Sequence, residues 1–463
     1  MPSPDALALP APARAPQAAI RPPVWLAAGS VIITLLLLLP LAYLLLRAAD
    51  VGERAWAMAL SPRTLRILGN SALLVLLVTC CSAALGVPLA WLTARSDLPG
   101  RKVWAVLTTL PLVIPSYVGG FALIAFMGPR GMLQEWLARF GVERLPSIYG
   151  LVGAVWALTL FTYPYLLLSV RAGLRRADPS LEEAARSLGR SAWQTFWQVT
   201  LPNQRPAIAA GALLVALYTL SDFGAVSLLR FNSFTRAIYL QYRGSFDRSL
   251  AAVLALLLVA VTILILMGER SSQGRARFYR LTAGASRPPT IVALGRWKWP
   301  ALLFVFSVTM AALVIPLLVI LIWLGRGVAA GESFAPLGGV AWRSMQAALL
   351  AAGAGTLAAL PVAYLAVRFP GRLGLLCERA AYIGYGLPGI VVALSLVFFG
   401  ANYLPILYQT LPMLIFAYVV LFLPQALGAI RAGLMQSSPR LEEAARGLGL
   451  RPRAVLLRVT LPL

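Results

Sequence analysis

The chain has 463 residues, of which 60% are hydrophobic and 12% are charged, whereas average soluble domains carry about a quarter charged residues. In water, so much apolar sequence would leave large exposed apolar patches, so the composition excludes a soluble enzyme. Several uncharged stretches are long enough to cross a bilayer, and the chain is predicted to be a polytopic membrane protein. The formal net charge of +24 comes from short loops between apolar spans, which argues against nucleic-acid binding.

Some chemistries are excluded by missing residue types. Histidine is absent, and the three cysteines form neither a His-based metal site nor a C-x-x-C pair. No G-x-x-x-x-G-K-[ST] phosphate loop occurs, so any ATP must be bound by another chain. An intramembrane enzyme would also lack an acid–base pair. We therefore expect no cofactor, no metal site and no catalytic residue.

The predicted elements begin after residues 1–23, a Pro- and Ala-rich segment expected to be a disordered cytoplasmic N-terminus. The next stretch, from residue 24 to about 46, is too long for a signal-peptide core and is predicted to be a retained helix. Further spans are predicted, which gives ten helices in an all-α polytopic membrane protein. They lie near 67–94, 103–127, 150–170, 207–229, 250–267, 299–324, 344–367, 380–400 and 411–430.

The basic residues predict the orientation of these helices. If the N-terminus is inside and the spans alternate, 27 of the 40 Lys and Arg residues fall on the inner side. This bias favours a multi-pass membrane protein with a cytoplasmic N-terminus.

The chain contains an internal duplication. Residues 171–202 and 431–462 align without a gap at an offset of 260, and 17 of 32 positions are identical. A weaker similarity pairs Pro88–Leu92 with Pro361–Leu365. Six predicted spans lie between the two copies, so both copies face the same side in a parallel repeat. The predicted domains are a first repeat at 24–268 with its loop at 171–206, a cytoplasmic linker at 269–298, and a second repeat at 299–463 with its loop at 431–463.

Each copy of the repeated loop predicts two short helices around a glycine. A capping residue and a proline begin the first helix, and Glu182 with Arg186, or Glu442 with Arg446, forms an i,i+4 pair. A glycine in the left-handed conformation is expected to end it. The second helix carries an apolar ridge that a partner groove could cover, and a Leu-Pro pair is expected to end it. An amphipathic loop lying on the lipid surface is the alternative interpretation.

This loop resembles the E-A-A loop of binding-protein-dependent ABC importer permeases. The first copy fits as Glu183-Ala184-Ala185, Gly189 and Leu201-Pro202, and the second as Glu443-Ala444-Ala445, Gly449 and Leu461-Pro462. The resemblance implies a type I importer permease fold. It also implies that these residues, with Glu182 and Glu442, couple the permease to two cytoplasmic ATP-binding subunits. A periplasmic solute-binding protein would dock on the opposite face.

Two loops in one chain resemble the fused permeases of ferric iron and thiamine importers. The segments Ser221–Val226 and Phe231–Tyr239 are similar to the ferric-iron group. Ferric iron is therefore the expected substrate, and thiamine or another small solute is the alternative. The alternative from another class is a secondary transporter driven by an ion gradient. The presence of the loop in both repeats argues against it.

Asp222 is the only acid that falls within a predicted span. Because an ionisable group at membrane depth is costly, Asp222 is a candidate for the translocation path. A structural cap where a helix breaks before Gly224, or an ion pair with an arginine, would explain it equally well.

The second repeat is shorter than the first. In the first repeat two spans follow Pro202, whereas Pro462 is followed by Leu463 alone. The repeat predicts two further helices, twelve in all, and a natural end near residue 528.

Overall fold

The computed structural model describes residues 22–142, 144–177, 180–244, 249–272, 291–384, 387–437, 439–450, 452–455 and 458–459. These residues fold almost entirely into helices, and their one β-type pairing is an isolated bridge between Ser96 and Val292. A helix satisfies its backbone hydrogen bonds within one segment, as an apolar segment in a membrane requires. The predicted all-α class is confirmed.

The chain separates into two compact units. The larger unit comprises Tyr43–Val340 and Gly386–Ser395, and the smaller unit comprises the other residues. Three helices continue from one unit into the other, namely α1 (Val24–Ala49), α17 (Ala335–Arg368) and α19 (Gly389–Tyr403). The packing units therefore divide the chain at different places from the sequence repeats.

The larger unit is a helical bundle. Its other helices, in chain order, are α2 (Glu53–Ala59), α3 (Pro62–Arg95), α4 (Arg101–Leu107), η2 (Leu110–Val113), α5 (Ser116–Met127), α6 (Met132–Ala138), α7 (Leu151–Arg176), α8 (Ser180–Ser187), α9 (Ala192–Thr195), η3 (Phe196–Thr200), α10 (Leu201–Asn203), α11 (Arg205–Ser221), α12 (Gly224–Leu228), α13 (Phe234–Gly244), α14 (Ser249–Ser272), η4 (Gly295–Trp297), α15 (Lys298–Thr309), η5 (Met310–Val314) and α16 (Ile315–Ala329).

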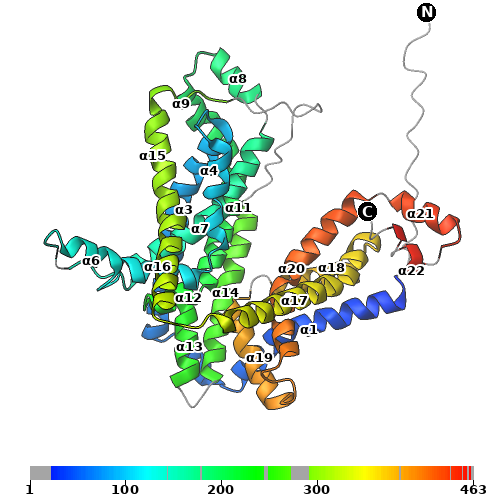
Figure 1. Cartoon of the computed structure of the whole chain (residues 1–463). Helices are drawn as coiled ribbons and strands as arrows, with labels where there is room; N and C mark the ends of the chain where they lie inside the picture. The colour runs from blue at the N-terminus through cyan, green and yellow to red at the C-terminus, as the bar shows by residue number, and fades with distance from the viewer. Residues whose placement is uncertain are drawn as a thin grey trace, which may run out of the picture. The chain divides into compact units, whose positions relative to one another are not determined.

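Helices α3, α7 and α11 form the centre of this unit and run side by side (Figure 1). Small residues bring their backbones together. A Cβ at Gly86 of α3 would lie 3.1 Å from the carbonyl oxygen of Tyr163 in α7, and one at Gly211 of α11 would lie 2.7 Å from the Cα of Leu166. Close approach through small residues is how membrane helices pack without a hydrophobic driving force.

Three of the predicted spans are broken, so their prediction as single helices was wrong. The span near 103–127 bends by 98° between Arg101–Val113 and Ser116–Ala138, where Pro111 and Pro115 lack the backbone N–H that a helix needs. The span near 207–229 stops at Ser221 and restarts at Gly224. The span near 380–400 is split between α18 (Arg372–Ile383) and α19, with Pro388 just before α19.

The smaller unit contains the counterparts of α3 and α7. These are α17 and α20 (Leu411–Gln436), which carry the second copies of the aligned segments. The unit also contains α18, α21 (Pro439–Gly447) and α22 (Pro452–Val455). Glu378 of α18 forms an ion pair of 2.5 Å with Arg431 of α20. An open cavity of about 830 Å³ lies between α17 and α20, and small residues such as Ala348, Ala352 and Gly355 line its α17 side.

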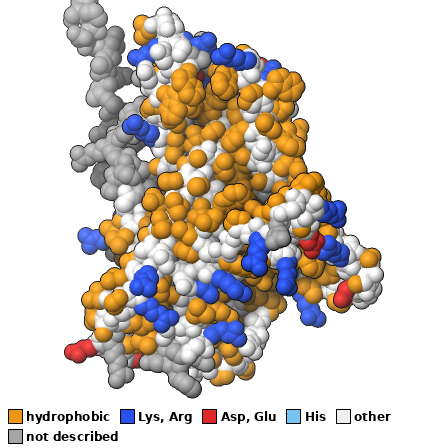
Figure 2. Space-filling view, turned by 90° about the vertical axis from the view of Figure 1, so that its left-hand side faces the viewer, with side chains coloured by type: hydrophobic (Ala, Val, Ile, Leu, Met, Phe, Trp, Pro, Cys, Tyr) orange, Lys and Arg blue, Asp and Glu red, His pale blue; other side chains and the backbone are white. Residues whose placement is uncertain are grey.

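Membrane-spanning length is reached by seven helices in the described residues, or by eight if the bent α4–α6 segment counts as one span. α11 and α19 are shorter apolar helices. The predicted count of ten is therefore not confirmed, although the predicted spans all fall on apolar helical sequence. Figure 2 shows hydrophobic side chains over most of the visible face, with Lys and Arg side chains at its upper end and again across its lower half.

Candidate functional site

The first copy of the repeated loop forms the predicted helix–glycine–helix. α8 ends at Gly189, whose φ of +83° is left-handed. The Gly189 N–H donates to the Arg186 carbonyl at 3.0 Å, and the Arg190 N–H donates to the Ala185 carbonyl at 3.2 Å. This pair of bonds is a Schellman motif, which satisfies carbonyls that the helix end would leave unpaired. The predicted glycine stop is confirmed.

The second helix of this loop begins with a capping box. Ser191 Oγ accepts from the Gln194 N–H at 3.2 Å, and Gln194 Oε1 accepts from the Ser191 N–H at 3.0 Å. The helix then continues through the π-helical turn Phe196–Thr200 into Leu201–Asn203. The helix ends at Asn203, one residue after the Leu201-Pro202 pair that was expected to end it, and Gln204 forms a turn before α11.

The second copy has the same local geometry. α21 ends at Gly449, whose φ is +84°, and the Leu450 N–H donates to the Ala445 carbonyl at 3.1 Å. α22 then begins at Pro452. The predicted site residues Leu461 and Pro462 lie outside the described residues, as do the capping positions 178–179 and 438.

A buried ion pair holds the first loop to the end of α3. Arg95 Nη2 lies 2.6 Å from Glu182 Oε1, and the two side chains are 1% and 14% exposed. The same carboxylate oxygen accepts from Thr200 Oγ1 at 2.9 Å. Glu182 therefore ties both helices of the loop to α3.

The second loop is held in the same way to the end of α17. Arg368 Nε lies 2.8 Å from Glu442 Oε1, with side chains 9% and 4% exposed. Tyr364 OH donates to Glu442 Oε2 at 3.1 Å, and Arg368 Nη2 donates to the Ser437 carbonyl at 3.2 Å. The two ion pairs lie in different packing units, yet their geometry is alike.

These arginine partners were missed from the sequence. The partner expected for Glu182 was Arg186, one helical turn away, but the recorded partner is Arg95, 87 residues earlier. The sequence did contain a signal for these partners, because Arg95 and Arg368 each stand seven residues after the aligned prolines Pro88 and Pro361.

The remaining predicted loop residues point outward or pack locally. Glu183, Ala184, Glu443 and Ala444 are exposed, whereas Ala185 and Ala445 are each 7% exposed and buried beneath their helices. Each loop therefore has an inner face, with Glu182 or Glu442, and an outer face that is free in this structure to meet a partner.

The outer face of the first loop is strongly apolar. Trp193 and Trp197 are 68% and 50% exposed, and both pack against Phe196 with ring centroids 6.1 and 5.6 Å away. Phe196 in turn contacts Trp91 of α3, edge to face, at 5.6 Å. Exposed aromatic side chains on a rigid base are typical of a protein-binding surface.

Asp222 lies in the break between α11 and α12. Its Oδ1 accepts from the Ala225 and Val226 N–H groups at 3.0 and 3.3 Å, which caps α12. Ser116 Oγ donates to its Oδ2. None of the ion pairs recorded in the described residues involves Asp222. The geometry is that of a helix cap, and a role on the translocation path stays a prediction.

Asp222 is also remote from the loops. α11 has 17 residues, and a helix rises 1.5 Å per residue, so Asp222 lies about 25 Å from the loop end of α11. Among the described residues, no group of three or more Cys, Asp or Glu side chains could hold a metal ion. The candidate site is therefore the pair of loops, with Asp222 as a separate position.

Known proteins are similar to this chain in sequence. A family model described as "Binding-protein-dependent transport system inner membrane component" matches residues 86–273 and 351–463. The Fe(3+)-transport system permease protein FbpB 2 of Haemophilus influenzae is 36% identical over 447 residues, which cover 96% of this chain and 85% of that protein. The sulfate permease CysT of Escherichia coli is 28% identical over 52% of this chain. The molybdenum permease ModB of Escherichia coli is 32% identical over 44% of this chain.

The two family matches each include one E-A-A loop and together cover well over half of the chain. The iron-transport relative spans both matched segments in one alignment. This chain therefore belongs to the family of binding-protein-dependent transport system inner membrane components, as a membrane permease subunit that is not itself an enzyme.

Proposed function

We propose that this chain forms the membrane path of an ATP-driven importer of ferric iron that a periplasmic binding protein delivers. The observation that carries the proposal is the length of the alignment with the iron-transport relative, which covers both repeats of this chain. The sulfate and molybdenum relatives align over about half of the chain. Ferric iron is therefore favoured over these anions.

We infer further that each loop docks on one cytoplasmic ATP-binding subunit. The buried ion pairs Arg95–Glu182 and Arg368–Glu442 support this inference, because they join each loop rigidly to a long helix. A movement of the docked subunit would then pass directly into α3 or α17. The exposed faces around Leu188 and Leu448, which are 82% and 85% exposed, would meet the subunits.

The orientation follows the charge bias. Because the predicted topology puts 27 of 40 basic residues on the loop side, we infer that the loops and the N-terminus face the cytoplasm. The binding protein would then dock on the opposite face.

Uptake by the reconstituted complex tests the function. The permease, its ATP-binding subunit and the iron-binding protein are placed in vesicles, and entry of radioactive ferric iron is followed with and without ATP. We expect ATP-dependent uptake that excess sulfate, molybdate or thiamine does not reduce. Competition by one of these solutes would reassign the substrate, and uptake driven by an ion gradient without ATP would contradict the importer.

A further inference from the structure

Residues 291–298, the last part of the predicted linker, return to the end of α3. The Val292 N–H donates to the Arg95 carbonyl at 2.8 Å, and the Asp97 N–H donates to the Val292 carbonyl at 3.2 Å. Ser96 and Val292 thereby form the isolated parallel bridge. The carbonyl of Arg95 is one of those that a helix end leaves unpaired, and Val292 satisfies it.

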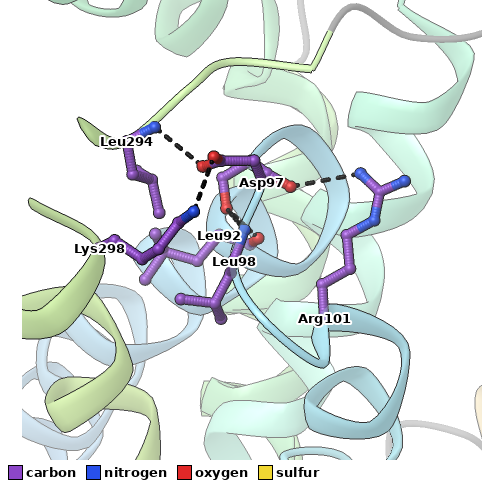
Figure 3. A network of polar contacts seen from close by, with 7 residues as sticks. Leu92, Asp97, Leu98, Arg101, Leu294 and Lys298 are labelled. Carbon is purple, nitrogen blue, oxygen red and sulfur yellow. Dashed lines mark hydrogen bonds and ion pairs between the residues drawn. The ribbon is translucent and has the colours of Figure 1, made fainter.

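The Asp97 side chain strengthens this contact (Figure 3). Its Oδ1 accepts from the Leu294 N–H at 2.8 Å, across 197 residues of sequence. Its Oδ2 lies 3.2 Å from Lys298 Nζ, at the start of α15. The Leu294 N–H, and to a smaller extent Lys298, lower the pKa of Asp97, so this carboxylate is charged at neutral pH.

The far end of the segment is anchored as well. α15 and the following η5 pack into the core of the larger unit, where Val305 of α15 and Ala312 of η5 are fully buried in the same cluster as residues of α3 and α7. Phe306 of α15 contacts Trp104 of α4 edge to face, with ring centroids 6.5 Å apart. Residues 291–298 are thus fixed at α15 and at Asp97.

Arg95 is the residue that connects this segment to the loop. Its backbone carbonyl is bound by Val292, and its guanidinium binds Glu182. We propose that residues 291–298 form a clamp on the end of α3, with Asp97 as its positioning residue, and that the clamp holds Arg95 where it fixes the first loop. The proposal deepens the coupling role proposed above, because it concerns how one coupling loop is mounted.

The second repeat lacks the residues for such a clamp. Ser96, Asp97 and Leu98 separate Arg95 from Pro99, whereas Phe369 alone separates Arg368 from Pro370. No carboxylate stands at the corresponding place. The second loop is therefore an internal control within the same chain.

Amide hydrogen exchange on the full chain in lipid nanodiscs tests the clamp without requiring transport. The variants are Asp97→Ala, Asp97→Asn, which keeps an acceptor for Leu294, and Lys298→Gln, which removes only the ion pair. Asp50→Ala, at an exposed acid, is the control. Loss of a hydrogen bond changes a local equilibrium by about five- to tenfold. We expect Asp97→Ala to speed amide exchange by about that factor over residues 291–298 and 180–200. Exchange over residues 439–450 should be unchanged. Asp97→Asn should speed exchange over 291–298 and 180–200 by a smaller factor.

Unchanged exchange over 291–298 in Asp97→Ala would overturn the clamp. Faster exchange there with no change over 180–200 would overturn its action on the loop. If the chain proves not to couple to an ATPase, the proposed function fails while these exchange results still decide the clamp.

A double-mutant comparison then tests the route through Arg95. If the clamp acts through the ion pair, Asp97→Ala should lower stimulated ATPase activity in a Glu442→Gln background but add nothing in a Glu182→Gln background. Equal additional losses in both backgrounds would show that Asp97 acts by another route.

Discussion

At the scale of single residues, neighbouring glutamates of one loop have opposite surroundings. Glu182 faces inward to Arg95, whose side chain is almost fully buried; Arg95 Nη2 binds Glu182, and its Nη1 has no hydrogen-bond partner among the described residues. Glu183, the next residue, is exposed. A change of the same chemistry at the two positions should therefore have different consequences.

Glu182→Gln is expected to destabilise the protein strongly, since it leaves the charge of Arg95 buried and unpaired. Breaking a buried ion pair costs about 3–5 kcal/mol of unfolding free energy. Glu183→Gln should change it by less than about 0.5 kcal/mol, because the site is at the surface. Thermal unfolding in detergent measures both, and equal melting temperatures for the two variants would contradict the structural role of Glu182.

Two substitutions at Asp222 distinguish its role as a helix cap from the role of its charge. Asp222→Asn keeps an oxygen acceptor for the Ala225 and Val226 N–H groups, whereas Asp222→Ala removes it, at a cost of about 1 kcal/mol. If Asp222 also contributes its charge to the path, Asp222→Asn should reduce uptake severalfold while stability stays near that of the native protein. Uptake is measured at equal amounts of each variant in the membrane. Native uptake by Asp222→Asn would show that Asp222 acts as a helix cap and that its charge is not needed for transport.

At the scale of elements, the glycine stops are the sharpest test of the loops. Valine at Gly189 would be forced into a left-handed conformation at a cost of about 1–3 kcal/mol, although no neighbouring atom lies within 4 Å of the new Cβ. We expect Gly189→Val with Gly449→Val to abolish stimulated ATPase activity while the protein still inserts. Asparagine tolerates this conformation, so the matching Asn double variant should retain most activity. Full transport by the Val double variant would contradict the coupling role.

Local features of the fold could be predicted from sequence, because their causes are local. The glycine stops and most helical spans depend on neighbours within a few residues. The break at Pro115 was missed because uncharged apolar sequence runs through it, whereas the break at Asp222 was one of the interpretations that its charge within an apolar span suggested. Arg95–Glu182 and the segment 291–294 could not be predicted, since each contact depends on how distant elements pack and 291–294 carries no periodic pattern.

At the scale of the whole molecule, the two loops differ in sequence where the first carries its exposed tryptophans. Trp193 and Trp197 of the first loop align with Arg453 and Leu457 of the second. If the loops dock on ATP-binding subunits as proposed, the first loop offers an aromatic face, and the sequence of the second predicts a mixed basic and aliphatic face.

We expect the first face to bind more tightly. Buried tryptophans at interfaces each contribute about 2 kcal/mol or more, so Trp193→Ala with Trp197→Ala should weaken binding of the ATP-binding subunit by more than about tenfold. Arg453→Ala with Leu457→Ala is the matched variant and should weaken it less. Binding to nanodisc-held permease measures both, and equal losses would show that the faces are equivalent.

The bridge between Ser96 and Val292 also sets an order of events during synthesis. α3 and the first loop leave the ribosome long before the segment that binds the end of α3. At about 5–20 residues per second, the roughly 100 residues between the loop and Lys298 take about 5–20 seconds to make. Through that interval the Arg95 carbonyl has no Val292 to bind. The first repeat can therefore reach its final form only after the ribosome has begun the second.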